Sequence, residues 1–136
     1  MTYKLLGKDF TPPDVVAKVT GEAKYAEDFR APGMVFCRLL TSPLPHARVL
    51  NIDVSEALQM PGVVGVLLPD EVKNPPGAGA PMLTKEPSYI GAPILALAAE
   101  SETQAHDALE KVKIDYERLP FTLDPLQSLR PGGPDA

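Results

Sequence analysis

The sequence predicts a small α+β domain with mixed strands, one main helix and several short helices. Three observations support this fold class. Short apolar runs typical of strands are separated by turn residues, and a single long segment has helical periodicity. The chain also has 16 prolines in 136 residues, against an average usage of roughly 5%. Because these prolines are clustered, we expect short elements joined by rigid turns.

Five apolar runs predict strands. Their ranges are 34–40, 48–52, 63–68, 93–99 and 112–117. Alternation along the first run places Val35, Cys37 and Leu39 on one face of the strand. The third run is apolar nearly throughout, and this composition predicts a strand that is buried on both faces.

The main helix is predicted to begin after Ser101, because Ser101 and Gln104 have the spacing of a capping box. One apolar stripe then follows at helical spacing. Its members are Ala105, Ala108, Leu109 and Val112. A short terminal helix is expected after Asp124 and Pro125, which suit the cap and the first helical position.

Two further short helices are expected earlier in the chain. The first would be capped by Thr11, begin at Pro12 and end at Gly21. The second would follow Asp53, which forms a capping-box pattern with Glu56. The stretch between 22 and 33 is expected to be irregular.

The domain is predicted to span residues 1–129. Residues 69–88 are interpreted as a surface excursion within it, with an exposed Pro/Gly loop at 75–81. Residues 130–136 have the Pro/Gly composition of a linker.

Composition argues against several functional classes. The net charge is −5, no basic run occurs and tryptophan is absent, so the chain lacks the electrostatic footprint of nucleic-acid binding. No apolar run approaches the roughly 20 residues that cross a bilayer, and no membrane contact is expected. The single cysteine, Cys37, excludes an internal disulfide and suits a reducing compartment. A cytoplasmic location is therefore expected.

Few residues are candidates for chemistry. Cys37, His46 and His106 lack the spacing of a metal site, and Cys37 is expected to be a small core residue. We therefore predict no catalytic, cofactor-binding or metal-ligating residue in this chain.

A proline-set loop at 42–46 is instead a candidate interface, formed by Pro43, Pro45, His46 and Arg48. The first interpretation of His46 is structural, with its ring bonded to a nearby backbone carbonyl. The alternative is a contact to another domain or subunit. A catalytic base ranks third, because no nucleophile or paired carboxylate is close in sequence.

Five motifs follow one another through nearly the whole chain. They are VTGEAKY at 19–25 with Asp28 and PGM at 32–34; TSPLPHARV at 41–49; Ile52-Asp53 with PGV at 61–63; YIGAP at 89–93; and VKIDYERLP at 112–120. Together they resemble the start of the molybdenum-binding large subunit of the xanthine dehydrogenase and aldehyde oxidase family, the molybdenum hydroxylases. The corresponding domain of that family is an α/β hammerhead.

The resemblance implies that the full subunit holds molybdopterin and hydroxylates aldehydes, aromatic heterocycles or related carbon centres with oxygen from water. Electrons then leave through iron–sulfur clusters, usually to FAD, in partner domains or subunits. The family's cofactor-binding segments lie downstream of the hammerhead, so no cofactor is expected in this chain. Its implied partners are the downstream molybdopterin domains and the iron–sulfur domain or subunit.

The chain is therefore expected to be a non-catalytic scaffold domain of a molybdopterin-dependent hydroxylase or dehydrogenase, and inactive alone. In the family, arginine often stands where this chain has Thr41, and glutamine where it has Ala92. Each departure removes a polar contact group. The alternative is a free-standing binding or adaptor module that reuses the fold. A carrier domain is disfavoured, because Lys24 and Lys113 are not obviously at a hairpin tip. Substrate, electron acceptor, oligomeric state and the natural end of the chain are left open.

Overall fold

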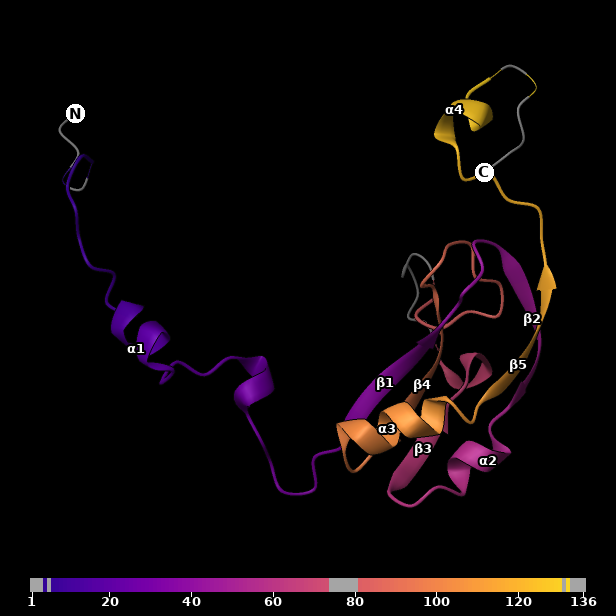
Figure 1. Cartoon of the computed structure of the whole chain (residues 1–136), viewed down its shortest axis with the longest axis horizontal. Helices are drawn as coiled ribbons and strands as arrows, with labels where there is room; N and C mark the ends of the chain where they lie inside the picture. The colour runs from indigo at the N-terminus through magenta and orange to yellow at the C-terminus, as the bar shows by residue number, and fades with distance from the viewer. Residues whose placement is uncertain (1–3, 5, 74–80, 131, 133–136) are drawn as a thin grey trace. The chain divides into compact units, whose positions relative to one another are not determined.

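The computed structural model describes residues 4, 6–73, 81–130 and 132. The chain divides into two compact units, Met1–Met34 and Val35–Ala136 (Figure 1). Most of the predicted loop at 75–81 and most of the linker at 130–136 lie outside the described residues. The domain bounds drawn from the sequence, 1–129 and 130–136, stay predictions.

The first unit contains α1 (Val15–Thr20) and one 3-10 turn, η1 (Ala26–Asp28), and neither has a buried residue. The predicted cap at Thr11 is wrong, because the helix begins at Val15. The ring of Pro13 disfavours helical backbone at the residue before it, so a helix cannot readily start at Pro12. The predicted stop is confirmed, since Gly21 adopts the left-handed conformation with φ 76°.

A three-stranded antiparallel sheet dominates the second unit. Its strands are β1 (Phe36–Thr41), β3 (Val63–Leu67) and β4 (Pro93–Ala99), in the order β1-β4-β3. The central strand β4 was predicted at these bounds, and the others differ by one or two residues. This agreement arises because Pro93 and the polar pair after Ala99 mark both strand ends in the sequence.

A two-stranded antiparallel ribbon is formed by β2 (Ala47–Asp53) and β5 (Lys113–Arg118). Arg48 lies opposite Glu117 in this ribbon, and Asp53 lies opposite Lys113. Its outward side is therefore rich in charge.

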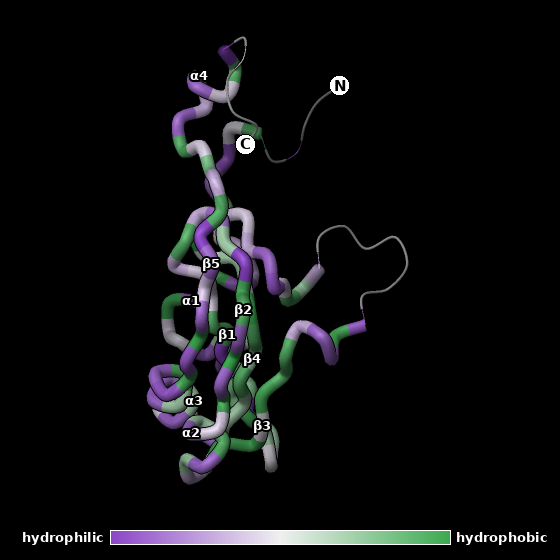
Figure 2. Tube along the Cα trace, turned by 90° about the vertical axis from the view of Figure 1, so that its right-hand side faces the viewer, coloured by the Kyte–Doolittle hydropathy of each residue, from purple (hydrophilic) through white to green (hydrophobic). Residues whose placement is uncertain are grey.

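Helix α3 (Glu102–Leu109) packs on one face of the three-stranded sheet, beside the shorter α2 (Ser55–Leu58) (Figures 1 and 2). The cap is as predicted, with Ser101 Oγ accepting from the Gln104 N–H at 3.3 Å. Alanines on the helix meet leucines on the central strand. The fully buried core consists of Ala57, Leu95, Leu97, Ala99, Ala105 and Ala108.

The capping box predicted at Asp53 is wrong, because α2 begins at Ser55 and its N-cap is Val54, without a side-chain cap. Asp53 Oδ1 accepts from the Ser55 N–H at 2.9 Å, and hydrogen bonds from Ser55 lower the pKa of this carboxyl. Glu56 pairs with Lys113 of β5 instead of closing the box, and this hydrogen bond raises the pKa of Lys113. The ion pair thereby ties α2 to the ribbon.

The remaining short elements are η2 (Pro69–Glu71) and α4 (Pro125–Ser128). The start of α4 is as predicted, since Asp124 Oδ1 accepts from the Leu126 N–H at 2.9 Å and Pro125 is the first helical residue. Among the described residues, no helix is long and apolar enough to span a bilayer.

Two burial predictions are wrong. Cys37 was expected in the core and is exposed. The run at 63–68 was expected to be buried on both faces, but Val64 is 61% exposed and Leu67 is 44% exposed. Cys37 and Leu67 lie on the face of the sheet opposite α3 and α2. Val64 lies at the irregularity between Val63 and Gly65, where it has no partner in β4.

Candidate functional site

The loop at 42–46 is held rigidly by the backbone around it. Ser42 is buried, and its hydroxyl donates to Leu44 O at 2.9 Å and accepts from the Leu44 N–H at 3.1 Å. The Ser42 N–H donates to Ala92 O at 2.9 Å, and Ser42 O accepts from the Gly91 N–H at 2.9 Å. Gly91 has φ 94°, a conformation that favours glycine. The two motifs at 41–49 and 89–93 are therefore paired in space.

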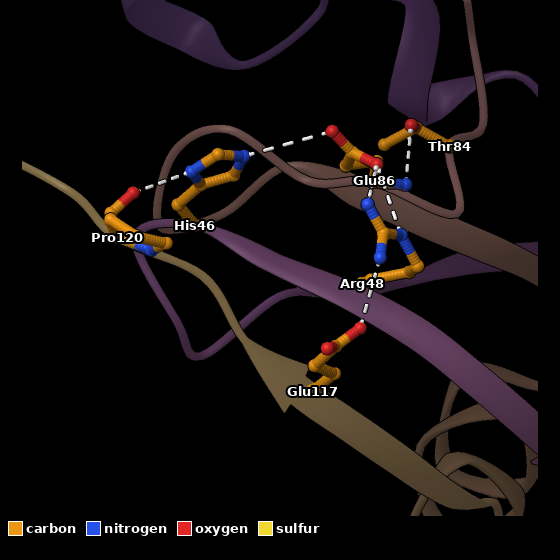
Figure 3. A network of polar contacts seen from close by, with 6 residues as sticks. All are labelled: His46, Arg48, Thr84, Glu86, Glu117 and Pro120. Atoms are coloured by element: carbon orange, nitrogen blue, oxygen red, sulfur yellow. Dashed lines mark hydrogen bonds and ion pairs between the residues drawn. The ribbon is translucent and has the colours of Figure 1, made fainter. Parts of the chain in front are cut away.

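His46 bonds within its own domain. Its Nδ1 lies 2.7 Å from Pro120 O (Figure 3). Because a carbonyl only accepts, this contact assigns a proton to Nδ1. The Nε2 atom lies 3.8 Å from Glu86 Oε1, which is beyond a hydrogen bond. This geometry agrees with the first interpretation of His46 from the sequence, a structural histidine bonded to a backbone carbonyl.

Arg48 is also engaged within the chain. Its Nε and Nη2 each lie 3.3 Å from Glu86 Oε2, and its Nη1 lies 3.0 Å from Glu117 Oε2 (Figure 3). Glu86 is positioned in turn by its own N–H, which donates to Thr84 Oγ1 at 3.0 Å. The Arg48 side chain is 50% exposed, so each pair contributes only about 0.2–1 kcal/mol. The network connects β2, β5 and the segment before Ser88.

An apolar hollow opens beside this network, with a volume of about 470 Å³. Pro45 and His46 form part of its lining. The other lining residues are Ser88, Tyr89, Ile90, Phe121, Thr122 and Leu123. Phe121 is 50% exposed and Leu123 is 71% exposed.

The sequence-based interface set contained neither Phe121 nor Leu123. These residues reach the hollow because the Leu119 N–H donates to His46 O at 3.1 Å, which continues the ribbon past β5. Phe121 and Leu123 follow the predicted strand closely in the sequence, and their apolar character could have indicated a contact surface. Pro43 is exposed and does not line the hollow.

The remaining candidates are dispersed. His106 is exposed on α3, with Nε2 3.8 Å from Glu110 Oε1. Among the residues that the structure describes, no group of three or more His, Cys, Asp or Glu is placed to hold a metal ion. The hollow beside Pro45 and His46 can receive apolar groups of another surface. Arg48 adds little to such a contact, because all three of its guanidinium nitrogens already bond within the chain.

The fold and motifs together define one family. The family profile described as "Aldehyde oxidase and xanthine dehydrogenase, a/b hammerhead domain" matches residues 20–120. The chain belongs to this family, as the sequence motifs indicated. The predicted α+β hammerhead fold is confirmed as well, by the two comparisons with solved structures that follow.

The aldehyde oxidoreductase of Desulfovibrio desulfuricans ATCC 27774 matches with a TM-score of 0.84 and 30% identity, over 96% of this chain and 16% of the other. A Cu,Mo CO dehydrogenase matches with a TM-score of 0.83 and 30% identity, over 94% of this chain and 17% of the other. The large chain of the carbon monoxide dehydrogenase of Hydrogenophaga pseudoflava is 33% identical over 85% of this chain and 16% of its own length. The chain thus spans about a sixth of the length of these relatives.

Proposed function

We propose that this chain is a non-catalytic scaffold domain of a molybdopterin-dependent hydroxylase or dehydrogenase. The family match supports the domain assignment, and the similar Cu,Mo CO dehydrogenase supports a molybdenum enzyme as the whole. The full enzyme would oxidise an aldehyde, an aromatic heterocycle or a related carbon centre. Molybdopterin would be held by the remainder of the subunit, and iron–sulfur clusters and FAD by partner domains or subunits.

One observation carries the non-catalytic part of the proposal. The ionisable side chains gathered around His46 lie at the surface and are paired with one another. Catalytic groups more often lie in a cleft, where burial or an unbalanced charge surrounds them. The network of Arg48, Glu86 and Glu117 has the form of a structural clamp, which fixes the loop relative to both strands of the ribbon.

The test is metal analysis and activity of the purified 136-residue chain. We expect no stoichiometric molybdenum by plasma mass spectrometry and no substrate-dependent dye reduction. The positive control is a purified holoenzyme of the same family measured in parallel. Stoichiometric molybdenum or dye reduction by the chain alone would refute the proposal.

We also propose that Pro43, Pro45, His46 and Arg48 contribute to an interface with the molybdopterin domains or the iron–sulfur partner. The apolar hollow beside Pro45 and His46 supports this proposal, because a partner side chain would bury its exposed aromatic and aliphatic lining. Since His46 and Arg48 bond inside the chain, they would shape this surface and hold it in place.

Replacing both residues, by His46→Ala with Arg48→Ala, should weaken assembly of the full enzyme while the 136-residue chain stays folded. His106→Ala is the matched control, because His106 is an exposed histidine on α3. Unfolding of the double variant would instead favour a purely structural role for the loop.

The alternative function is a free-standing binding or adaptor module. The burial of Ala92 favours this alternative. Ala92 is 1% exposed, and it stands where the resemblance to the family implies glutamine. A buried alanine cannot supply that polar contact. Sequencing the gene beyond Ala136 discriminates the two functions, because only a scaffold domain requires cofactor domains in the same or a neighbouring gene. A cytoplasmic location is part of the lead proposal and is supported by the single cysteine.

A further inference from the structure

The three-stranded sheet has a second face, opposite α3 and α2, that we call the open face. Two rows of paired residues form it, Cys37–Ala98–Gly65 and Leu39–Ala96–Leu67. Side chains alternate along each strand, so these six lie on the opposite side from the buried Leu95 and Leu97. All six are uncharged and apolar, apart from the thiol of Cys37.

The open face is shaped to receive another surface. Leu39 is 51% exposed and Leu67 is 44% exposed. The residue between them is Ala96, and the neighbouring row consists of the small residues Cys37, Ala98 and Gly65. A hollow of about 300 Å³ lies here, lined by Cys37, Gly65, Val66, Leu67, Ala96 and Ala98. A Cβ built on Gly65 would meet nothing within 4 Å. Small residues flanked by leucines leave room for an inserted apolar side chain.

Strand composition also indicates a missing cover. An antiparallel sheet with one face in water alternates apolar and polar residues, as β5 does with KIDYER. The central strand β4 reads PILALAA and is apolar on both sides. Figure 2 shows α3 and α2 on one side of these strands. The sequence of β4 is therefore that of a strand covered on both sides. Among the described residues, the second side is buried at Ile94 and only partly buried at Ala96 and Ala98.

We propose that the remainder of the molybdenum-binding subunit packs on the open face through an apolar, uncharged segment. This inference rests on the proposed function. Relatives match this chain over only 16–17% of their length, so about five sixths of each related polypeptide is available to supply the segment. A charged occupant is disfavoured, because the face has no partner for a buried charge. A segment on the same polypeptide also binds at high effective concentration.

The first test places a charge on the open face of the full molybdenum-binding subunit, as its gene or gene pair encodes it. Leu39→Arg should reduce the yield of molybdenum-containing subunit about tenfold or more, because docking would bury an unpaired charge. Leu50→Arg is the matched control, since Leu50 is 64% exposed in β2 of the ribbon, and its yield should be unchanged. The 136-residue chain carrying Leu39→Arg should keep its unfolding temperature within about 2 °C.

The second test needs no substitution and stands even if Leu39→Arg fails to fold. Cys37 is exposed in this chain and should react readily with a maleimide. In the full subunit the same thiol should react at least about tenfold more slowly, since access limits thiol reactivity. Mass spectrometry of the tryptic peptide 31–38 reads Cys37 separately from other cysteines.

Equal labelling rates for Cys37 in the chain and in the full subunit would overturn the inference. So would a full subunit whose yield is unaffected by Leu39→Arg. A concentration-dependent dimer of the 136-residue chain that Leu39→Arg abolishes would assign the face to a second copy and would also overturn it. None of these results contradicts the proposed function. That proposal has its own test, and it fails if the chain alone holds molybdenum or reduces dye.

Discussion

The open face of the three-stranded sheet and the outer side of the β2–β5 ribbon are both exposed, yet their chemistry differs. The ribbon carries Arg48 opposite Glu117, and a second carboxylate, Glu86, completes the set of ion pairs. The open face carries alanine, glycine, leucine and one cysteine. A charged surface that pairs with itself is stable in water, whereas an apolar face gains free energy only when another surface covers it. Exposure alone therefore does not identify an interface.

The largest expected effect contrasts the two faces of the sheet. Leu97 is fully buried beneath α3, and Leu97→Ala should lower the free energy of unfolding of the chain by about 2–5 kcal/mol. Leu39→Ala, on the open face, should cost no more than about 1 kcal/mol. Chemical denaturation of both variants measures the difference. Similar losses would mean that the open face is already packed in the isolated chain.

Two glycines at the edges of these regions provide the next contrast. Gly62 has φ 82° and Gly91 has φ 94°, so alanine at either position should cost roughly 1–2 kcal/mol in backbone strain. A Cβ at Gly62 would also lie 2.2 Å from Gln104 Nε2, whereas nothing lies within 4 Å at Gly91.

Displacing the Gln104 amide endangers its 2.8 Å hydrogen bond from Ser101 Oγ. We therefore expect Gly62→Ala to be more destabilising than Gly91→Ala by about 0.5–1.5 kcal/mol. Thermal unfolding at matched protein concentration compares them. The opposite order would show that the loop at 91 is the tighter constraint.

A smaller effect is expected on the ribbon. Arg48→Met should cost about 1 kcal/mol or less, because its ion pairs are exposed, and the loss should shrink in high salt. A double-mutant cycle with Glu117→Gln isolates one pair, for which we expect a coupling energy of about 0.2–1 kcal/mol. A coupling several times larger would indicate that the network is shielded from water.

The smallest effect concerns Tyr116 of β5. Burial raises the pKa of its phenol, whose usual value is about 10. The folded state then holds this proton more tightly than the unfolded state does. The resulting contribution to the free energy of unfolding is fully present below pH ~10, and it is lost as the pH rises through the folded pKa.

The unfolding temperature of the wild-type chain should therefore fall slightly more above pH ~10 than that of Tyr116→Phe. The difference in phenolate absorbance between the two proteins reports Tyr116, and its titration midpoint should lie above the usual phenol pKa of about 10. A midpoint at or below it would contradict the assigned burial.

Local signals in the sequence accounted for most elements. Ser101 with Gln104 marked the start of α3, Gly21 marked the end of α1, and Pro93 marked the start of β4. These signals succeed because caps, positive φ and proline act on the backbone within a few residues. The motifs were likewise sufficient to indicate the family.

Burial and pairing required the tertiary structure. The sequence correctly placed Cys37 and Leu39 on the same face of β1. It could not show which face α3 covers, because both faces of a strand follow the same two-residue alternation. The partners of His46 and Arg48 come from residues 38 to 74 positions away, beyond any local pattern. Only the packed chain decides such contacts, because they depend on the pairing of β2 with β5 and on the path of the segment that carries Glu86.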